Sequence, residues 1–253
     1  FGVQGFDSTA AFRPITKSAS RILSVGEIVP TLEKRWREAS GGRKGVSFID
    51  FPMDIQRRSV DLPVGEVPTS AHPVEEDLHG IDIAPDDRRA DSLMCAERPL
   101  IYLGNGVRDG DALDFVRRIV ETLRVPFLLS WSALDLIHDD HALNMGRVGI
   151  YGDRAANILL QKCDFLLTIG TRLAIPQTGY DKTDFARKAQ RWVVDIDSVE
   201  LSKFEMPGWN TIRASAEMFC ESLSETVADI VHFPGEPWIA ECERVWRVLP
   251  REN

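Results

Sequence analysis

Residues 99–129 read PLIYLGNGVRDGDALDFVRRIVETLRVPFLL, and this stretch decides the fold class. Its first part, 99–106, is a continuous apolar run that ends in glycines, as expected of a strand buried on both faces. Residues 110–123 predict a helix, and a second apolar run at 125–130 predicts the next strand. The apolar face of the helix consists of Ala112, Phe115, Val116, Ile119, Val120 and Leu123. This order of strand, helix and strand is typical of a parallel sheet covered by helices.

The same alternation continues to about residue 222. Short helices are predicted in the later half of 146–163 and at 183–190. Three further apolar runs predict strands, at 164–170, 191–197 and 210–215. We therefore expect an α/β fold, with a doubly wound parallel sheet of about six strands and helices on both faces.

The segment before this region predicts too little structure for a domain of its own. Residues 1–56 contain one helical pattern, at 25–40, and one apolar strand, at 45–52. A single helix and a single strand cannot bury their apolar faces on each other and be stable. We therefore expect this segment to be the truncated end of a preceding α/β domain. The absence of a signal-like segment after Phe1 fits a chain that begins inside a domain.

Two segments are predicted to be linkers, around a central domain at 98–222. Residues 57–97 are rich in proline, charge and small polar residues, and they close with a short helical pattern at 84–97. Residues 223–253 continue one helix and then place apolar residues at helical spacing from Trp238 to Trp246.

Composition excludes several classes of function. The 253 residues are 43% hydrophobic and 27% charged, with a formal net charge of -9, which argues against nucleic-acid binding. No apolar run approaches the roughly 20 residues that span a bilayer. Four cysteines without a CxxC pair are typical of reduced thiols in a cytoplasmic protein: Cys95, Cys163, Cys220 and Cys242. His138 and His141 lie in a polar turn, and we predict no metal site.

Four segments place unusual residues where ligands bind in parallel sheets, beyond the carboxyl ends of the strands. They are Gly104–Gly106, the glycine-rich segment 146–157, Arg172, and Asp195 with Asp197. Glycines before a helix can bind an anion, an arginine can bind phosphate, and a carboxylate can accept hydrogen bonds from a ribose. Taken singly, each also fits a tight turn, a plain loop, a surface ion pair or a helix cap. Taken together, they favour an adenine dinucleotide cleft.

Five motifs in consecutive order resemble the thiamine-diphosphate-dependent enzymes of the acetolactate synthase group, including relatives from sugar and polysaccharide biosynthesis. They are VQGFDSTAAFRPITK (3–17), GGRKGVSFIDFPMDIQ (41–56), GRVGIYGDRAAN (146–157), IGTR (169–172) and VVDID (193–197). The set is specific, although any one motif is weak.

The resemblance implies a parent enzyme that decarboxylates a 2-keto acid, expected to be pyruvate, and transfers the two-carbon unit to a carbonyl acceptor. Residues 1–56 would be the C-terminal remnant of its pyrimidine-binding domain, and 223–253 would lead to a diphosphate-binding domain. In this family the catalytic glutamate lies upstream of the matched region, and the Gly-Asp-Gly motif for magnesium and thiamine diphosphate lies downstream. We therefore expect the 253-residue chain alone to be inactive, and the parent to be a homodimer or homotetramer. Gln4 and Lys17 are candidates for the substrate channel.

The resemblance also implies FAD in a non-redox role in the central cleft. The flavin contacts carried over by position are Gly104, Gly106, Ser130, Trp131, Gly149, Tyr151, Arg172, Gln177, Asp195 and Ile196. Three departures weaken this: Tyr151 replaces a histidine, AIPQTG (174–179) lacks a second arginine, and Ser215 replaces a carboxylate. The loss of one charge-assisted contact of about 1.5–3 kcal/mol would lower affinity about ten- to a hundredfold.

Two alternatives remain open: a nucleotide-binding or scaffold module without catalysis, and a 2-keto acid decarboxylase with an empty central cleft. A truncated chain should also expose apolar patches around residues 1–12 and 238–246.

Overall fold

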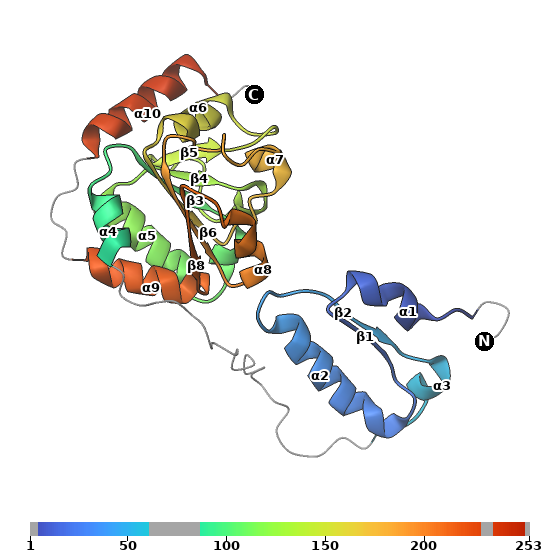
Figure 1. Cartoon of the computed structure of the whole chain (residues 1–253). Coiled ribbons are helices and arrows are strands. Elements are labelled where there is room, and N and C mark those ends of the chain that lie inside the picture. Colours follow the sequence, from blue (N-terminus) through green and yellow to red (C-terminus); the bar gives the residue numbers. More distant parts are fainter. Residues whose placement is uncertain (1–4, 61–86, 229–234, 251–253) are drawn as a thin grey trace. The chain divides into compact units, whose positions relative to one another are not determined.

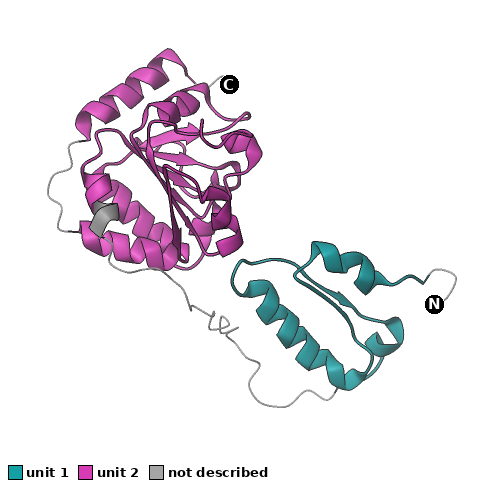
Figure 2. Ribbon diagram, in the orientation of Figure 1, with its two compact units in different colours: residues 1–79 teal, residues 80–253 magenta. Residues whose placement is uncertain are grey.

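The computed structural model describes residues 5–60, 87–228 and 235–250. The chain divides into two compact units, residues 1–79 and residues 80–253 (Figure 2), and each is described by itself. In the part of the chain described, no helix is both long and apolar enough to cross a bilayer.

The second unit contains a six-stranded sheet in which every neighbouring pair of strands is parallel (Figure 1). The strand order is β5-β4-β3-β6-β7-β8. The strands are β3 (Pro99–Leu103), β4 (Phe127–Leu129), β5 (Asn144–Arg147), β6 (Phe165–Ile169), β7 (Gln190–Asp195) and β8 (Trp209–Arg213). The predicted α/β fold with about six parallel strands is confirmed.

Helices cover both faces of this sheet. They are α4 (Asp87–Met94), α5 (Ala112–Leu123), α6 (Arg154–Lys162), α7 (Ile175–Thr178), α8 (Ser198–Leu201), α9 (Ala216–Val227) and α10 (Glu236–Val248). In Figure 1, α4, α5 and α9 gather on one side of the sheet, and α6 and α10 lie on the other.

Alternation along the strands separates two apolar cores. On β3, Ile101 and Leu103 face the core that includes α5 and α9, whereas Leu100 and Tyr102 face the core that includes α6 and most of α10. All four side chains are at most 1% exposed. Burial on both faces explains why the strands appear in the sequence as continuous apolar runs.

The helix predicted at 183–190 is wrong, because this segment forms turns. Ala186 has a φ of 47°, in the left-handed region that does not continue a helix. The guanidinium Nη1 of Arg191 lies 3.3, 3.4 and 3.1 Å from the carbonyl oxygens of Lys182, Thr183 and Phe185. These carbonyls therefore bond to a buried arginine, and the Lys182 carbonyl also accepts from Phe185 N at 3.3 Å, as in a turn. Strand β5 was also missed by the sequence analysis.

The apolar patch predicted at 238–246 is wrong as well. Helix α10 packs on α6, and Trp238 and Cys242 are 2% and 0% exposed. The indole Nε1 of Trp238 donates to the carbonyl oxygen of Pro99 at 2.9 Å. The apolar spacing that suggested an uncovered surface instead covers the sheet of this same chain.

The first unit is smaller and less buried. It contains α1 (Ser8–Phe12), β1 (Ser18–Arg21), α2 (Ile28–Ser40), β2 (Ser47–Asp50) and α3 (Met53–Gln56). The sequence analysis missed β1, which pairs in parallel with β2. The buried core consists of Ile22, Ile28 and Ile55. Of the apolar patch expected over residues 1–12, Phe6 is 62% exposed, Phe12 is half-buried with its ring stacked on Phe48, and residues 1–4 lie outside the described residues.

Candidate functional site

The carboxyl ends of the six parallel strands lie at one edge of the sheet. Strand β3 is flanked by β4 and β6, so the direction of winding reverses between β3 and β6. Ligands bind at such a reversal in open α/β sheets. The ten predicted cofactor residues lie in β7 or beyond the carboxyl ends of β3, β4, β5, β6 and β7, with Gln177 in helix α7.

The glycines at the reversal are explained by contacts within the chain. The N–H groups of Gly104 and Gly106 donate to the carbonyl oxygens of Ile169 and Gly170, at 2.9 and 3.0 Å. A Cβ at Gly104 would lie 2.2 Å from the carbonyl oxygen of Gly170. The loops after β3 and β6 therefore pack backbone against backbone, as in the tight turn considered for the sequence.

The glycine-rich loop after β5 is held by two side chains at the start of α6. The side-chain amide of Asn157 accepts from Gly149 N and donates to Gly149 O, both at 3.0 Å. Asp153 accepts from the backbone N of Arg147 at 2.8 Å and pairs with the Arg147 guanidinium at 3.3 Å. Gly149 has a φ of 111°, which a side chain would strain. The sequence analysis missed Asp153 and Asn157, although their spacing at a helix start was the available signal.

Two exposed aromatic rings lie side by side at the same edge. The rings of Trp131, after β4, and Tyr151, after β5, are stacked with centroids 5.8 Å apart and planes 19° apart. Their residues are 49% and 74% exposed. Offset stacked rings of this kind present a flat apolar surface to which another planar ring can add. Predicted contacts from two separate loops thus form one surface.

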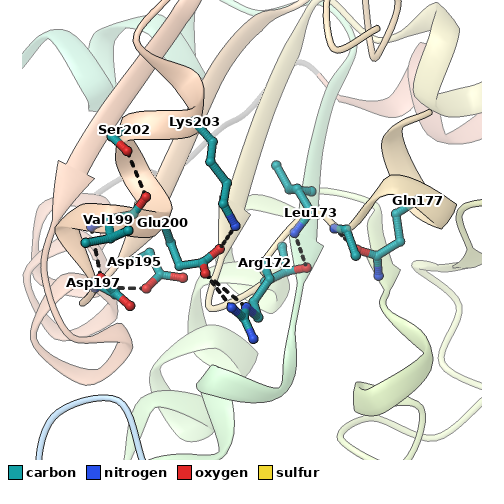
Figure 3. A network of polar contacts seen from close by, with 11 residues as sticks. Arg172, Leu173, Gln177, Asp195, Asp197, Val199, Glu200, Ser202 and Lys203 are labelled. Atoms are coloured by element: carbon teal, nitrogen blue, oxygen red, sulfur yellow. Dashed lines mark hydrogen bonds and ion pairs between the residues drawn. The ribbon is translucent and has the colours of Figure 1, made fainter. Parts of the chain in front are cut away.

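Arg172, after β6, is paired with a residue that the sequence analysis did not name. Figure 3 shows its guanidinium pointing at the carboxylate of Glu200 in α8, and Nη2 lies 2.5 Å from Oε1. Lys203 donates to the other oxygen of the same carboxylate. The Glu200 side chain is 7% exposed, whereas those of Arg172 and Lys203 are 64% and 42% exposed. The surface ion pair considered for Arg172 is therefore present, with a buried partner.

The pKa values reflect this pairing. Burial alone would raise the pKa of Glu200, but the hydrogen bonds from Arg172 and Lys203 outweigh burial and lower it to about 2. The pKa of Arg172 is raised, first by its hydrogen bond to Glu200 and then by the negative charges of Glu200, Asp195 and Asp197. Glu200 is therefore an anion throughout the neutral pH range.

The two aspartates after β7 hold the local backbone. Asp195 Oδ1 accepts from Asp197 N at 2.9 Å, and Asp197 Oδ1 accepts from Val199 N at 2.9 Å (Figure 3). Asp197 is therefore the helix cap that the sequence allowed. Gln177 Oε1 similarly accepts from Ala174 N at 3.1 Å, at the start of α7. Ile196 is half-buried beside Asp195.

A second arginine, missed by the sequence analysis, links two loops at this edge. Arg108 Nη2 lies 2.5 Å from Asp135 Oδ1, and Arg108 Nε donates to Asn105 Oδ1 at 3.0 Å. The Arg108 and Asp135 side chains are 44% and 74% exposed. Ser215 accepts from Met218 N at 3.2 Å and caps α9. Ser130, another predicted contact, is 2% exposed.

The candidates in the first unit differ in outcome. Lys17 Nζ donates to the carbonyl oxygens of Gly41 and Arg43, at 2.8 and 3.1 Å, and so holds the turn after α2. Gln4 lies outside the described residues.

Cysteine and histidine side chains were also considered in the sequence. All four cysteines are free thiols. Burial raises the pKa of Cys163 and Cys220 to about 12, and burial raises that of Cys242 also. Within residues 5–60, 87–228 and 235–250, no three His, Cys, Asp or Glu side chains are grouped as metal ligands.

The family comparison agrees with this architecture. Residues 87–223 match the family model described as "Thiamine pyrophosphate enzyme, central domain". The matched segment begins with α4 and ends within α9, so it includes the whole six-stranded sheet.

Individual relatives match more of the chain. A probable acetolactate synthase large subunit from Methanocaldococcus jannaschii is 31% identical over 79% of this chain and 34% of its own length. The acetolactate synthase isozyme 1 large subunit of Escherichia coli is 31% identical over 81% of this chain and 35% of its own. A 3D-(3,5/4)-trihydroxycyclohexane-1,2-dione hydrolase from Geobacillus thermodenitrificans is 24% identical over 96% and 38%, respectively. The chain spans about a third of the length of the curated relatives it matches.

Proposed function

Because this chain belongs to the thiamine pyrophosphate enzyme family, whose central domain it contains at residues 87–223, we propose that it is part of an acetolactate-synthase-like enzyme. The proposed reaction is decarboxylation of a 2-keto acid, pyruvate, followed by transfer of the two-carbon unit to a carbonyl acceptor. The observation that carries the proposal is the family match over the complete sheet, together with two acetolactate synthase relatives at 31% identity.

Thiamine diphosphate, bound with Mg²⁺, would supply the electron sink for this chemistry. The described residues of this chain contribute a platform rather than reacting groups, because the side chains at the carboxyl edge bond mainly to the chain itself. We propose that residues 1–253 alone do not turn over a 2-keto acid, which is supported by their match to about a third of each relative. In the proposed division, 1–56 is the end of a pyrimidine-binding domain, 98–222 is the central domain, and 57–97 and 223–253 are connections.

The central cleft is proposed to hold FAD in a non-redox role. Three features of the edge fit a dinucleotide: the stacked rings of Trp131 and Tyr151, the exposed guanidinium of Arg172, and the carboxylate of Asp195. The rings fit a planar base or flavin, the guanidinium fits phosphate, and the carboxylate fits a ribose hydroxyl. Gly104, Gly106, Gly149 and Gln177 are better explained by contacts within the chain, so their part in binding would be to shape the loops.

An empty cleft, as in a 2-keto acid decarboxylase, is the second candidate. The pairing of Arg172 with Glu200 favours it, because a cation that is already compensated attracts phosphate less strongly. A module without catalysis is the third candidate, and the relatives named as synthases and a hydrolase speak against it.

The first experiment is a visible absorption spectrum of the protein after purification and after incubation with FAD and removal of excess ligand. The proposal predicts a flavin absorption spectrum that corresponds to one FAD bound per chain. Replacement of both rings, Trp131→Ala with Tyr151→Ala, should weaken FAD binding about tenfold, since each stacked ring contributes about 0.5–1.5 kcal/mol. The matched control is Trp36→Ala, which removes a 63% exposed ring from the first unit and should leave FAD binding unchanged. A spectrum without flavin in both preparations would favour the empty cleft.

The second experiment measures decarboxylation of pyruvate by the 253-residue chain and by the complete reading frame that contains it, each with thiamine diphosphate and Mg²⁺. We expect turnover only in the longer protein. Turnover by the 253 residues would contradict the proposed division, and none in either would contradict the reaction. Size-exclusion chromatography of the longer protein tests the proposed homodimer or homotetramer. The cytoplasm is the compartment we propose, supported by four free thiols, three of them buried.

A further inference from the structure

The ion-paired cluster at Arg172 is unusual because its centre is an anion and its exposed members are cations. Glu200 is the acidic residue in the first turn of α8, and only 7% of its side chain is exposed. Both of its oxygens are used, one by Arg172 and one by Lys203 (Figure 3). The two cations come from different elements, the loop after β6 and the turn after α8, and the buried carboxylate fixes both at the carboxyl edge.

The balance of charge around Arg172 is not that of a free phosphate site. Asp195 and Asp197 also act electrostatically on Arg172, in addition to Glu200. Two cations therefore share their surroundings with three carboxylates. A phosphate group that approaches Arg172 from solvent would meet a guanidinium whose positive charge is largely compensated.

Glu200 is not easily released from this arrangement. A buried carboxylate that loses its cationic partners is strongly destabilising, so Glu200 stays between Arg172 and Lys203 when a ligand arrives. A ligand phosphate must then share the exposed sides of the two cations with a permanent intramolecular anion.

From this arrangement, we propose that Glu200 is a positioning residue for the nucleotide cleft. It orients Arg172 and Lys203 toward the carboxyl edge and competes with ligand phosphate for their charge, and so limits the affinity of the cleft for phosphate-bearing ligands. This role of Glu200 rests on the proposed nucleotide site, whose affinity for phosphate Glu200 would limit.

The test uses inorganic pyrophosphate as the probe, measured by titration calorimetry with the 253-residue chain at low ionic strength. Removal of the negative charge in Glu200→Gln should tighten pyrophosphate binding about five- to tenfold, as expected for one partly screened charge at close range. The gain should disappear in about 0.5 M salt, where exposed charges are screened. Glu200→Asp, which keeps the charge, should bind pyrophosphate like the parent.

Two further variants test whether the tighter pyrophosphate binding of Glu200→Gln comes from the Glu200–Arg172 ion pair or from altered packing. In the double variant Glu200→Gln with Arg172→Gln the gain should be lost, because the inference routes it through Arg172. Asp135→Asn is the matched control: it removes a carboxylate that lies 2.5 Å from Arg108 at the same edge but is 74% exposed. Its effect on pyrophosphate binding should be less than about twofold.

Lys203→Gln keeps the test decisive if Glu200→Gln folds poorly. Lys203 is half-exposed and contributes one of the two cations, so this variant should weaken pyrophosphate binding about threefold. The inference is overturned if Glu200→Gln binds pyrophosphate no more tightly than the parent, if the gain survives without Arg172, or if Lys203→Gln binds as well as the parent.

The same variants titrated with FAD separate this inference from the proposed function. If no variant binds FAD but the pyrophosphate affinities of the parent and the variants rank as predicted, FAD is rejected as the ligand and the role of Glu200 is kept. If the parent binds FAD but the pyrophosphate affinities do not rank as predicted, the proposed FAD site is kept and the role of Glu200 is rejected.

Discussion

Both units of this chain contain parallel strands joined by helices, but the strands of the second unit are far more buried than those of the first. In the second unit, every residue of β3 and β6 is buried, and separate apolar cores lie on the two faces of the sheet. In the first unit, all residues of β1 and β2 are only half-buried, and three isoleucines form the buried core. Parallel strands are stable when both faces are covered, so the second unit is the rigid part that can position a site.

The comparison predicts the largest difference for deletions in the two cores. Leu103→Ala removes a fully buried side chain from the large core and should lower the free energy of unfolding by about 3–5 kcal/mol. Ile22→Ala, also fully buried, should cost about 2 kcal/mol, because a small cluster collapses around the cavity more easily. Hydrogen exchange followed by mass spectrometry separates the units, and equal losses in both would contradict the difference in packing.

Glycine-to-alanine substitutions compare how tightly the backbone is packed in the two units. Gly104→Ala places a Cβ 2.2 Å from the carbonyl oxygen of Gly170, so the loops after β3 and β6 must separate, at a cost of about 3 kcal/mol. Gly26→Ala in the first unit meets nothing within 4 Å and is the matched control. It should be neutral or stabilising by about 0.5 kcal/mol. Urea unfolding of both variants is the measurement, and similar stabilities would show that the loop reversal is not tightly packed.

The pH dependence of stability should differ between two ion-paired carboxylates. The pKa of Glu200 falls to about 2 in the folded chain from an ordinary value of 4.5, so its contribution is complete above pH 4.5 and is lost as pH falls toward 2. Glu200→Gln should therefore cost about 2 kcal/mol at neutral pH, and the difference from the parent should shrink below pH 4.5.

Asp50 in the first unit provides the counterpart. Hydrogen bonds from Ser8 and then Arg21 lower its pKa, so its contribution is also lost at acidic pH. Its side chain is more exposed, 25% against 7%, and Asp50→Asn should change stability less than Glu200→Gln. Thermal unfolding of the parent and the two variants across the acidic range tests this, and a Glu200→Gln difference that grows below pH 4.5 would contradict the sign.

The smallest expected effect concerns two tryptophans. Trp238→Phe removes the indole donor to Pro99 O and leaves a buried carbonyl without that partner, which should cost about 1–2 kcal/mol. Trp36→Phe changes a 63% exposed ring in α2 and should alter stability by less than about 0.5 kcal/mol. Equal effects in denaturant titrations would contradict the docking of α10 on the sheet.

Most of the fold was predictable from patterns that depend on local physics. Continuous apolar runs and the helical spacing at 110–123 predicted strands and a helix that the structure contains, because burial on both faces leaves a strong mark on composition. The errors came where a side-chain contact overrides the local pattern or where a strand is short. Residues 183–190 have a helical composition, but Arg191 binds their neighbouring carbonyls and the segment turns instead. Strands β1 and β5 are short, four residues each, and carry no continuous apolar run.

The candidate site was predicted in outline but not in its contacts. The sequence located Trp131, Tyr151 and Arg172 at strand ends, and the topology places those ends at one edge. It did not indicate Glu200, because an acidic residue in a short polar helix looks like an ordinary surface residue. Only its burial and its two cationic partners distinguish it.

The sequence by itself determined the fold class and most of the alternation of strands and helices between residues 98 and 222, since hydrophobic periodicity is a local property that burial imposes on each segment. Tertiary structure decided which strands are neighbours, that α10 covers the sheet through Trp238, and that Arg172 meets Glu200. The two side-chain contacts join residues 28 and 139 positions apart in the chain, and a local sequence pattern does not predict contacts over such separations. The chemistry available at the carboxyl edge therefore follows from contacts that exist only after folding.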